Sequence, residues 1–185
     1  MRQGVAQFID RLATGRNFIM SIMIWLSYAI LIMGPAETSS ANNIGPIDLT
    51  FAQSPEMICK MIDGYGEDVR HRYMRAEIIW DGFHPLIYGV MLLLGFSYVM
   101  RQAGFHSGPR SNFLLAPLLV VGADYCENIG IVTLLSTYPS CSHEIAAAVS
   151  LLVTMKWVMA GLCLAFLITV SLFFIYRKIQ GYMNR

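Results

Sequence analysis

The chain has 185 residues, of which 56% are hydrophobic and only 14% are charged, and its formal net charge at pH 7 is +1. Soluble globular domains carry about 25% charged residues, so this composition excludes an ordinary soluble domain and indicates an integral membrane protein. The small net charge argues against nucleic acid as a partner. The length predicts a single transmembrane domain over residues 1–185.

The first part of the chain predicts an amphipathic lead-in followed by a membrane-spanning helix. Within residues 1–16, apolar side chains at positions 5, 8, 9 and 12 share one helical face. A nearly charge-free stretch follows and predicts a helix over about 17–34. No clean small-x-small cleavage site comes after it, so we interpret it as a retained helix and not as a signal peptide.

Residues 35–76 make up the only sizeable segment outside the predicted membrane helices. Its first half is rich in Pro, Ser, Asn and Gly and predicts irregular chain. Ser54, Pro55 and Glu56 then give an N-cap, a proline at the first helical position and an acid in the first turn. A short helix is expected to stop near Gly64, and a second to start near Glu67 and continue into the next membrane helix. We expect an outer cap here, with a solvated connector as the alternative.

Three further apolar stretches predict membrane helices over about 77–101, 112–137 and 145–176. A helix needs about 17 residues or more to cross the hydrocarbon layer at 1.5 Å per residue, and each predicted helix reaches this length. Pro85 and Pro117 lie inside two of them and are expected to kink the helix, which neighbouring membrane helices tolerate. The sequence therefore predicts an all-α integral membrane four-helix bundle, up-down-up-down, with a short helical extracytoplasmic cap between its first two helices.

The distribution of Lys and Arg predicts the orientation. Eight of these residues lie on the side that holds both termini and the connection between the second and third helices. Four lie in segment 35–76 on the other side, and none in the connection from Tyr138 to Glu144. Because cytoplasmic loops carry the excess of positive charge, both termini are expected to be cytoplasmic, with the chain in the inner (plasma) membrane.

The four cysteines show no C-x-x-C spacing, which removes the usual signature of a thiol oxidoreductase. Cys59 and Cys141 both fall on the predicted outer side, where a disulfide between them can form, although the sequence leaves the pairing open. Cys126 and Cys163 lie in the middle of predicted helices and are interpreted as small core residues.

Polar residues inside the predicted membrane helices fall at matching depths when each helix is counted from its outer end at 1.5 Å per residue. They are Trp25 and Tyr28 on the first helix, Asp81, His84 and Tyr88 on the second, Asp124, Glu127 and Asn128 on the third, and Lys156 and Trp157 on the fourth. Ionisable side chains are costly in a bilayer and mark functional sites. The pattern predicts a polar funnel that opens outward.

The charges of this funnel restrict its chemistry. Asp81, Asp124 and Glu127 against Lys156 sum to −2 if all are ionised and His84 is neutral. A low-dielectric site does not hold that charge, so either carboxylates are protonated or a cation is bound. Asp124 and Glu127 are one helical turn apart and are expected to titrate as a coupled pair. With Lys156 they are the candidate catalytic groups, and the other polar residues are candidate ligand-binding groups.

Several alternatives stay open at this level. Lys156 paired with Asp124 or Glu127 can be plain interhelical pairing. His84 is more often a hydrogen-bonding partner than a ligand, and paired haem ligands on facing helices are absent. The i, i+3 pairs Asp81/His84 and Asp124/Glu127 resemble di-iron bundles, but the first and fourth helices supply no Glu to complete such a site. No metal is predicted, and the cofactor is unknown.

Part of the pattern resembles an uncharacterised family of small bacterial four-helix integral membrane proteins. The matching residues span most of the chain: Asp48-Leu49, Ser54-Pro55-Glu56, Gly66-Glu67, Arg70, Tyr73, Asp81, Pro85-Leu86, Tyr88, Asp124-Tyr125, Glu127-Asn128, Tyr138-Pro139 and Lys156-Trp157. The Asp-Tyr-x-Glu-Asn run is the most specific of them. His84 and Cys126 depart from the family pattern, which has apolar residues there. The resemblance implies the fold and topology and no known activity.

Three functions are compatible with the sequence. The favoured one is a pocket that binds or acts on a lipid-like or amphipathic molecule, with the carboxylates as acid/base or cation-stabilising groups; enzymatic activity is left open. The second is a structural or assembly subunit that meets a partner membrane protein. The third is a proton- or cation-coupled transport element, which the absence of an inverted repeat disfavours.

Overall fold

The computed structural model describes residues 3–34, 44–104 and 113–183, and the chain is helical in these ranges, with no strand. The prediction of an all-α chain is confirmed. Four of the described helices are long and apolar enough to cross a membrane: Gly15–Met33, Gly66–Gln102, Leu115–Ser136 and His143–Arg177. Their lengths and compositions support a membrane protein.

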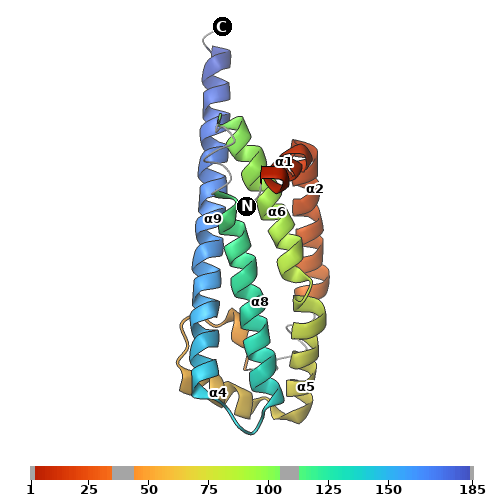
Figure 1. The fold of residues 1–185 in the computed structure, drawn as a ribbon, viewed down its shortest axis with the longest axis vertical. Coiled ribbons are helices and arrows are strands. Elements are labelled where there is room, and N and C mark those ends of the chain that lie inside the picture. The colour runs from red at the N-terminus through yellow and green to blue at the C-terminus, as the bar shows by residue number, and fades with distance from the viewer. Residues whose placement is uncertain (1–2, 35–43, 105–112, 184–185) are drawn as a thin grey trace.

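The described elements follow one another along the chain with short breaks. They are α1 (Gln3–Leu12), α2 (Gly15–Tyr28), the π-turn η1 (Ala29–Met33), the 3₁₀ turn η2 (Ile47–Leu49), α4 (Pro55–Gly64), α5 (Gly66–Ala76), the π-turn η3 (Glu77–Asp81), α6 (His84–Gln102), α8 (Leu115–Ser136) and α9 (His143–Met183). Figure 1 shows α2, α6, α8 and α9 along the long axis, with α4 and α5 at one end and α1 toward the other.

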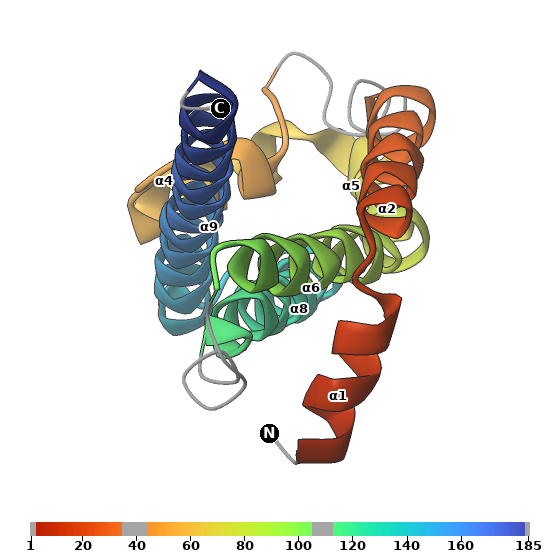
Figure 2. The ribbon, with the colours of Figure 1, turned by 90° about the horizontal axis from the view of Figure 1, so that it is seen from above.

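The long helices pack in a row that leaves one side open. α8 packs against both α9 and α6, and α2 packs against α6. Seen from above, α2 and α9 stand on opposite sides of the α6–α8 pair and do not close upon each other (Figure 2). Ser21 is the one buried residue of α2, so the described chain covers little of this helix.

Two apolar cores lie at different heights along the helices. The first joins α4 and α5 to the ends of α8 and α9, with Ile58, Tyr73, Leu134 and Val149 among its buried residues. The second joins α6, α8 and α9 at the other end. On each helix the polar residues lie between the positions that build these two cores, so the polar cluster is enclosed above and below by close-packed apolar side chains.

The helix limits follow the predictions with some shifts. Ser54 caps α4, with its side chain accepting from the Met57 N–H at 3.2 Å, and α4 ends at Gly64 as expected. α5 begins at Gly66 and continues through η3 toward α6, which confirms the expected continuity. The last helix starts at His143 and is longer than predicted. The predicted irregular chain lies partly at 35–43, outside the described residues.

Two predictions about single residues are wrong. Pro117 does not kink a helix, because α8 starts at Leu115 and the proline occupies the first turn, where no N–H partner is needed. Cys126 is exposed and is not a core residue. The buried face of α8 is set by Asp124, Glu127 and Ile131, and position 126 points about 200° away from position 124 at 100° per residue. Cys163 is buried, as expected.

The open question about the outer cysteines is settled by a disulfide between Cys59 on α4 and Cys141 in the turn before α9. The bond joins residues 82 apart in sequence and ties the segment that contains α4 to the start of the last helix. It therefore fixes the position of α4 on the end of the packed helices.

Candidate functional site

The second long helix is interrupted at the level of the polar cluster. The π-turn η3 ends at Asp81, and α6 starts at His84, with Pro85 in its first turn. A side chain at Gly82 would collide with the backbone oxygen of Ile78, so only glycine fits this turn. Pro85 has no N–H to offer the Asp81 carbonyl. The break therefore leaves backbone oxygens that need donors from elsewhere.

Neighbouring helices supply those donors. The Asp81 carbonyl accepts from the Asn128 amide (3.4 Å) and the Gly82 carbonyl from the Tyr125 hydroxyl (3.0 Å). The Trp80 carbonyl accepts from the Phe83 N–H (3.3 Å) and also from the Tyr28 hydroxyl (2.5 Å). Buried carbonyls without partners are costly. Tyr125 and Asn128, two members of the Asp-Tyr-x-Glu-Asn run, thus stabilise a helix break.

The other two members of that run bind the buried lysine. The Nζ of Lys156 lies 2.8 Å from Oε1 of Glu127 and 3.3 Å from Oδ1 of Asp124. The second oxygen of Asp124 accepts a hydrogen bond from the Tyr88 hydroxyl at 2.7 Å. The pairing that matched depths predict between the last two helices is confirmed.

His84 contacts a neighbour through each of its two ring nitrogens. The indole N–H of Trp25 donates to Nε2 of His84 at 3.2 Å. The other ring nitrogen, Nδ1, lies 3.4 Å from Oδ1 of Asp81. The rings of Tyr28 and Tyr88 lie against the same imidazole, with centroids 6.1 Å and 5.2 Å away. His84 therefore links α2 to the polar residues of η3 and α6.

The cluster contains two further buried acids, which the sequence analysis did not place in it. Asp48, in η2, is buried; its Oδ1 accepts from the Tyr73 hydroxyl at 2.7 Å, and its carbonyl accepts from the Trp157 indole at 2.9 Å. Burial raises the pKa of Asp48, against the opposing effect of Lys156. Glu77 is buried in η3, where it interacts electrostatically with Asp48, Asp81 and Glu127. Its spacing from Asp81 is the one signal that could have found it, since i and i+4 share a face.

The cluster has more acceptors than donors. Among the described residues, the buried side-chain atoms without a hydrogen-bond partner are all oxygens that can accept: Glu77 Oε2, Asp81 Oδ2, Glu127 Oε2 and Asn128 Oδ1. Within the same residues, the buried charged side chains are five carboxylates and one ammonium: Asp48, Glu77, Asp81, Asp124, Glu127 and Lys156. In the described ranges no three His, Cys, Asp or Glu residues are grouped so as to hold a metal ion.

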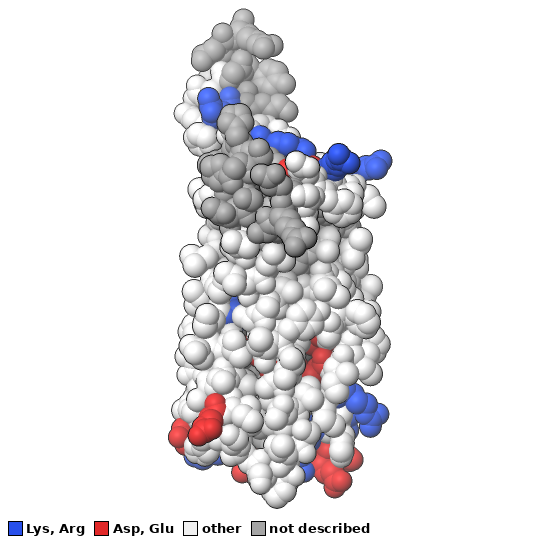
Figure 3. Space-filling view, in the orientation of Figure 1, with Lys and Arg blue, Asp and Glu red and all other residues white. Residues whose placement is uncertain are grey.

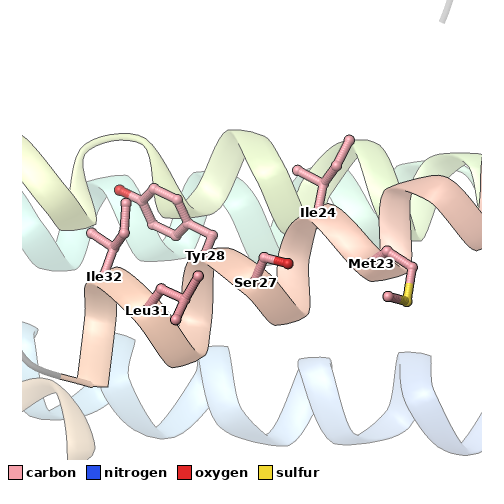
Figure 4. A pocket seen from close by; sticks show the side chains of 6 residues that line it. All are labelled: Met23, Ile24, Ser27, Tyr28, Leu31 and Ile32. Carbon is pink, nitrogen blue, oxygen red and sulfur yellow. The ribbon is translucent and has the colours of Figure 1, made fainter.

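An apolar groove of about 400 Å³ adjoins the cluster along α2 and η1. Figure 4 shows the side chains that line it: Met23, Ile24, Ser27, Tyr28, Leu31 and Ile32. Tyr28 belongs to both regions, because its ring lines the groove and also stacks on His84. The groove therefore adjoins the ring that stacks on His84, although His84 itself does not line it.

The predicted site residues form one connected set of contacts. It comprises Trp25, Tyr28, Asp81, His84, Tyr88, Asp124, Glu127, Asn128, Lys156 and Trp157. Trp157 differs from expectation in one respect: its N–H is occupied by the Asp48 carbonyl, while its ring lies 5.7 Å from the Lys156 ammonium. The proximity of these residues is established, and their functional roles stay predictions.

Comparisons with family models, with curated proteins and with solved structures find no match to this chain. The resemblance to small bacterial membrane proteins therefore stays a prediction, and function is argued from the site alone.

Proposed function

We propose that this protein binds, within the membrane, an amphipathic molecule whose head group is positively charged. The apolar part would occupy the groove along α2 and η1, and the head group would lie beside His84 and Asp81. The observation that carries the proposal is the excess of buried carboxylates over buried cations next to an apolar groove. The carboxylates would then be cation-stabilising groups.

The charge balance supports a cationic partner. If the five buried acids are ionised and His84 is neutral, Lys156 compensates only one of them. An uncompensated buried carboxylate is costly unless it takes up a proton or a counter-charge. Asp81 and Glu77 each keep one oxygen without a hydrogen-bond partner. These two acids are the ones that a bound cation would stabilise most directly.

The surroundings of Asp81 suit an organic cation. Tyr28 lines the groove, and its ring is stacked on that of His84, which in turn meets the ring of Tyr88 edge-on. Aromatic faces attract ammonium groups, by about 0.5–2 kcal/mol each depending on exposure. The ammonium group of an alkylated amine would contact both the aromatic rings and the carboxylate. Its alkyl chain would lie against Met23 and Leu31.

For the membrane arrangement, we propose an up-down-up-down four-helix bundle with α4 and α5 as an extracytoplasmic cap and both termini in the cytoplasm. The excess of Lys and Arg on the terminal side supports this orientation. The Cys59–Cys141 disulfide supports it independently, because disulfides persist outside the reducing cytoplasm. On the face drawn in Figure 3, a mostly uncharged band separates the charged ends.

One observation favours a structural role instead. All four named residues of the Asp-Tyr-x-Glu-Asn run already make internal contacts, either with Lys156 or with the carbonyls of the helix break. A structural subunit of a membrane complex needs no more than this from them. That role does not account for the unpaired oxygens of Glu77 and Asp81.

The test is a binding comparison on purified protein in nanodiscs. The probes are dodecyltrimethylammonium and an uncharged dodecyl maltoside of the same chain length. We expect the cationic probe to bind at least tenfold more tightly, and Asp81→Asn to remove about tenfold of that preference, equivalent to about 1.4 kcal/mol. Glu144→Gln changes an exposed acid at the outer end and is the matched control. Equal affinity of wild type for both probes would exclude the proposal.

A further inference from the structure

Helix α1 does not run along the long helices but turns away from α2 and projects to one side, next to α6 (Figure 2). The chain turns sharply between α1 and α2. Ala13 is fully buried at the turn, and the Thr14 side chain caps α2 by accepting from the Asn17 N–H at 3.2 Å. The Asn17 side chain donates back to the Leu12 carbonyl at 2.8 Å. These hydrogen bonds and the buried Ala13 therefore fix the direction of α1 relative to α2.

Contacts to α6 hold α1 in this position. The Ser97 hydroxyl donates to the carboxylate of Asp10. The Arg101 guanidinium donates to the carbonyls of Asp10 (3.0 Å) and Ala13 (2.5 Å), which are among the carbonyls left open at the end of α1. α1 is thus a docked helix that belongs to the folded structure.

The docked helix nevertheless leaves large apolar side chains uncovered. Val5, Phe8 and Leu12 share one face at i, i+3 and i+7, and they are 50%, 62% and 42% exposed. No described element packs over them. Arg11 is on α1 next to this face, and Arg16 follows the corner in the first turn of α2; both are exposed. A strongly amphipathic helix with basic residues next to its apolar face is typical of binding to a membrane surface.

The position of α1 relative to the first candidate membrane span indicates where α1 lies in the bilayer. That span begins at Gly15, directly after the corner. A helix that turns away from the span just before the chain enters the hydrocarbon lies at the membrane boundary. Figure 3 shows Lys and Arg side chains gathered at this end of the molecule, near the start of α2. Basic side chains at this depth meet the phosphate groups of the lipids.

We infer that α1 is a docking surface for anionic phospholipids. Val5, Phe8 and Leu12 insert between the upper parts of the acyl chains, while Arg11 and Arg16 pair with the negatively charged head groups. The partner is thus a bilayer surface that contains an anionic lipid. This inference depends on the membrane position of α2 and does not depend on the amphipathic ligand proposed above.

The test places spin labels on the full chain in nanodiscs. Cys126 and Cys163 are first replaced by Ala, which leaves the disulfide pair. Labels are then attached at Phe8→Cys and, as the control, at Gln7→Cys, which is exposed and lies outside the apolar face. The nanodiscs contain phosphatidylcholine alone or phosphatidylcholine mixed with phosphatidylglycerol. Collisions with apolar oxygen and with a water-soluble nickel chelate report the surroundings of each label.

In the mixed nanodiscs, we expect the oxygen-to-nickel collision ratio at position 8 to exceed that at position 7 several-fold. We expect this difference to shrink in phosphatidylcholine alone and in the double variant Arg11→Gln, Arg16→Gln. The inference is overturned if both labels are equally accessible to nickel. It is also overturned if the ratio is the same with and without the anionic lipid, since α1 would then be an apolar anchor without head-group recognition.

Discussion

Lys156 on α9 and Glu127 on α8 form a buried ion pair, with 2.8 Å between Nζ and Oε1, and Asp124 one turn earlier is the second partner of the same ammonium at 3.3 Å. α8 and α9 thus meet at a charge triad between the two apolar cores. Because this triad is enclosed and holds one ammonium for two carboxylates, it is sensitive to the loss of Lys156.

Replacement of Lys156 by Met is expected to lower the free energy of unfolding by about 3–5 kcal/mol, because Asp124 and Glu127 would be left buried without their cation. Thermal unfolding of the purified variant in detergent measures the loss. Lys60→Met, which removes an exposed lysine at the outer end, is the matched control and is expected to unfold like wild type. If both variants unfold like wild type, the triad does not hold the helices together.

Asp124→Asn and Glu127→Gln are expected to leave a folded, extractable protein, since an amide keeps one acceptor oxygen for Lys156. At least one of the two is expected to lose affinity for the cationic probe or to lose co-purifying lipid. Thermal stability and bound material are measured on the same preparations. If one variant is unstable while the other matches wild type in both respects, the second acid is not used for binding. The structural role would then replace the pocket.

The orientation is tested by cysteine labelling in intact cells, with Cys126 and Cys163 replaced by Ala. A membrane-impermeant maleimide is expected to label Glu67→Cys at the outer end and not Gln102→Cys at the inner end. Both positions are exposed, so a difference reports the side of the membrane and not burial. Labelling of Gln102→Cys alone would reverse the topology.

Loss of the disulfide is expected to destabilise the outer end. The double variant Cys59→Ser, Cys141→Ser opens a loop between residues 82 apart and should lower the free energy of unfolding by about 2–4 kcal/mol. A reducing agent should lower the melting temperature of wild type by a similar amount and leave that of the double variant unchanged. A reducing agent without effect on wild type would show that the bond does not contribute to stability.

Asp48 is expected to make stability depend on pH. Burial raises its pKa above the usual value of 3.8, so the folded state holds the proton more tightly than the unfolded chain. Its contribution is therefore fully present below the usual pKa and is lost as the pH rises through the raised value. Asp48→Asn should flatten the decline in stability as the pH rises above 3.8, relative to wild type. Glu56→Gln is the control, since backbone and Ser54 hydrogen bonds lower the pKa of this exposed acid and its contribution has the opposite sign. An unchanged slope in Asp48→Asn would contradict the prediction.

Residue counting along the helices was sufficient to place Lys156 with Asp124 and Glu127. The rise per residue is constant, and helices of this length cross the same hydrocarbon layer, so matched positions along different helices lie at matched depths. The regular helical spacing also predicted that His84 lies next to Asp81 and Tyr88. Composition and periodicity thus predicted the helical class and most of the polar cluster.

By contrast, only the tertiary structure shows where the irregular segments lie and which face of each helix is covered. Asp48 lies in a short 3₁₀ turn, and its contact with Trp157 joins residues 109 apart in sequence. No periodicity links such positions, because a loop has no fixed rise or repeat. The exposure of Cys126 and the uncovered face of α1 depend in the same way on which neighbours pack against a helix. The sequence determines the faces of each helix, but only packing determines which of those faces is covered.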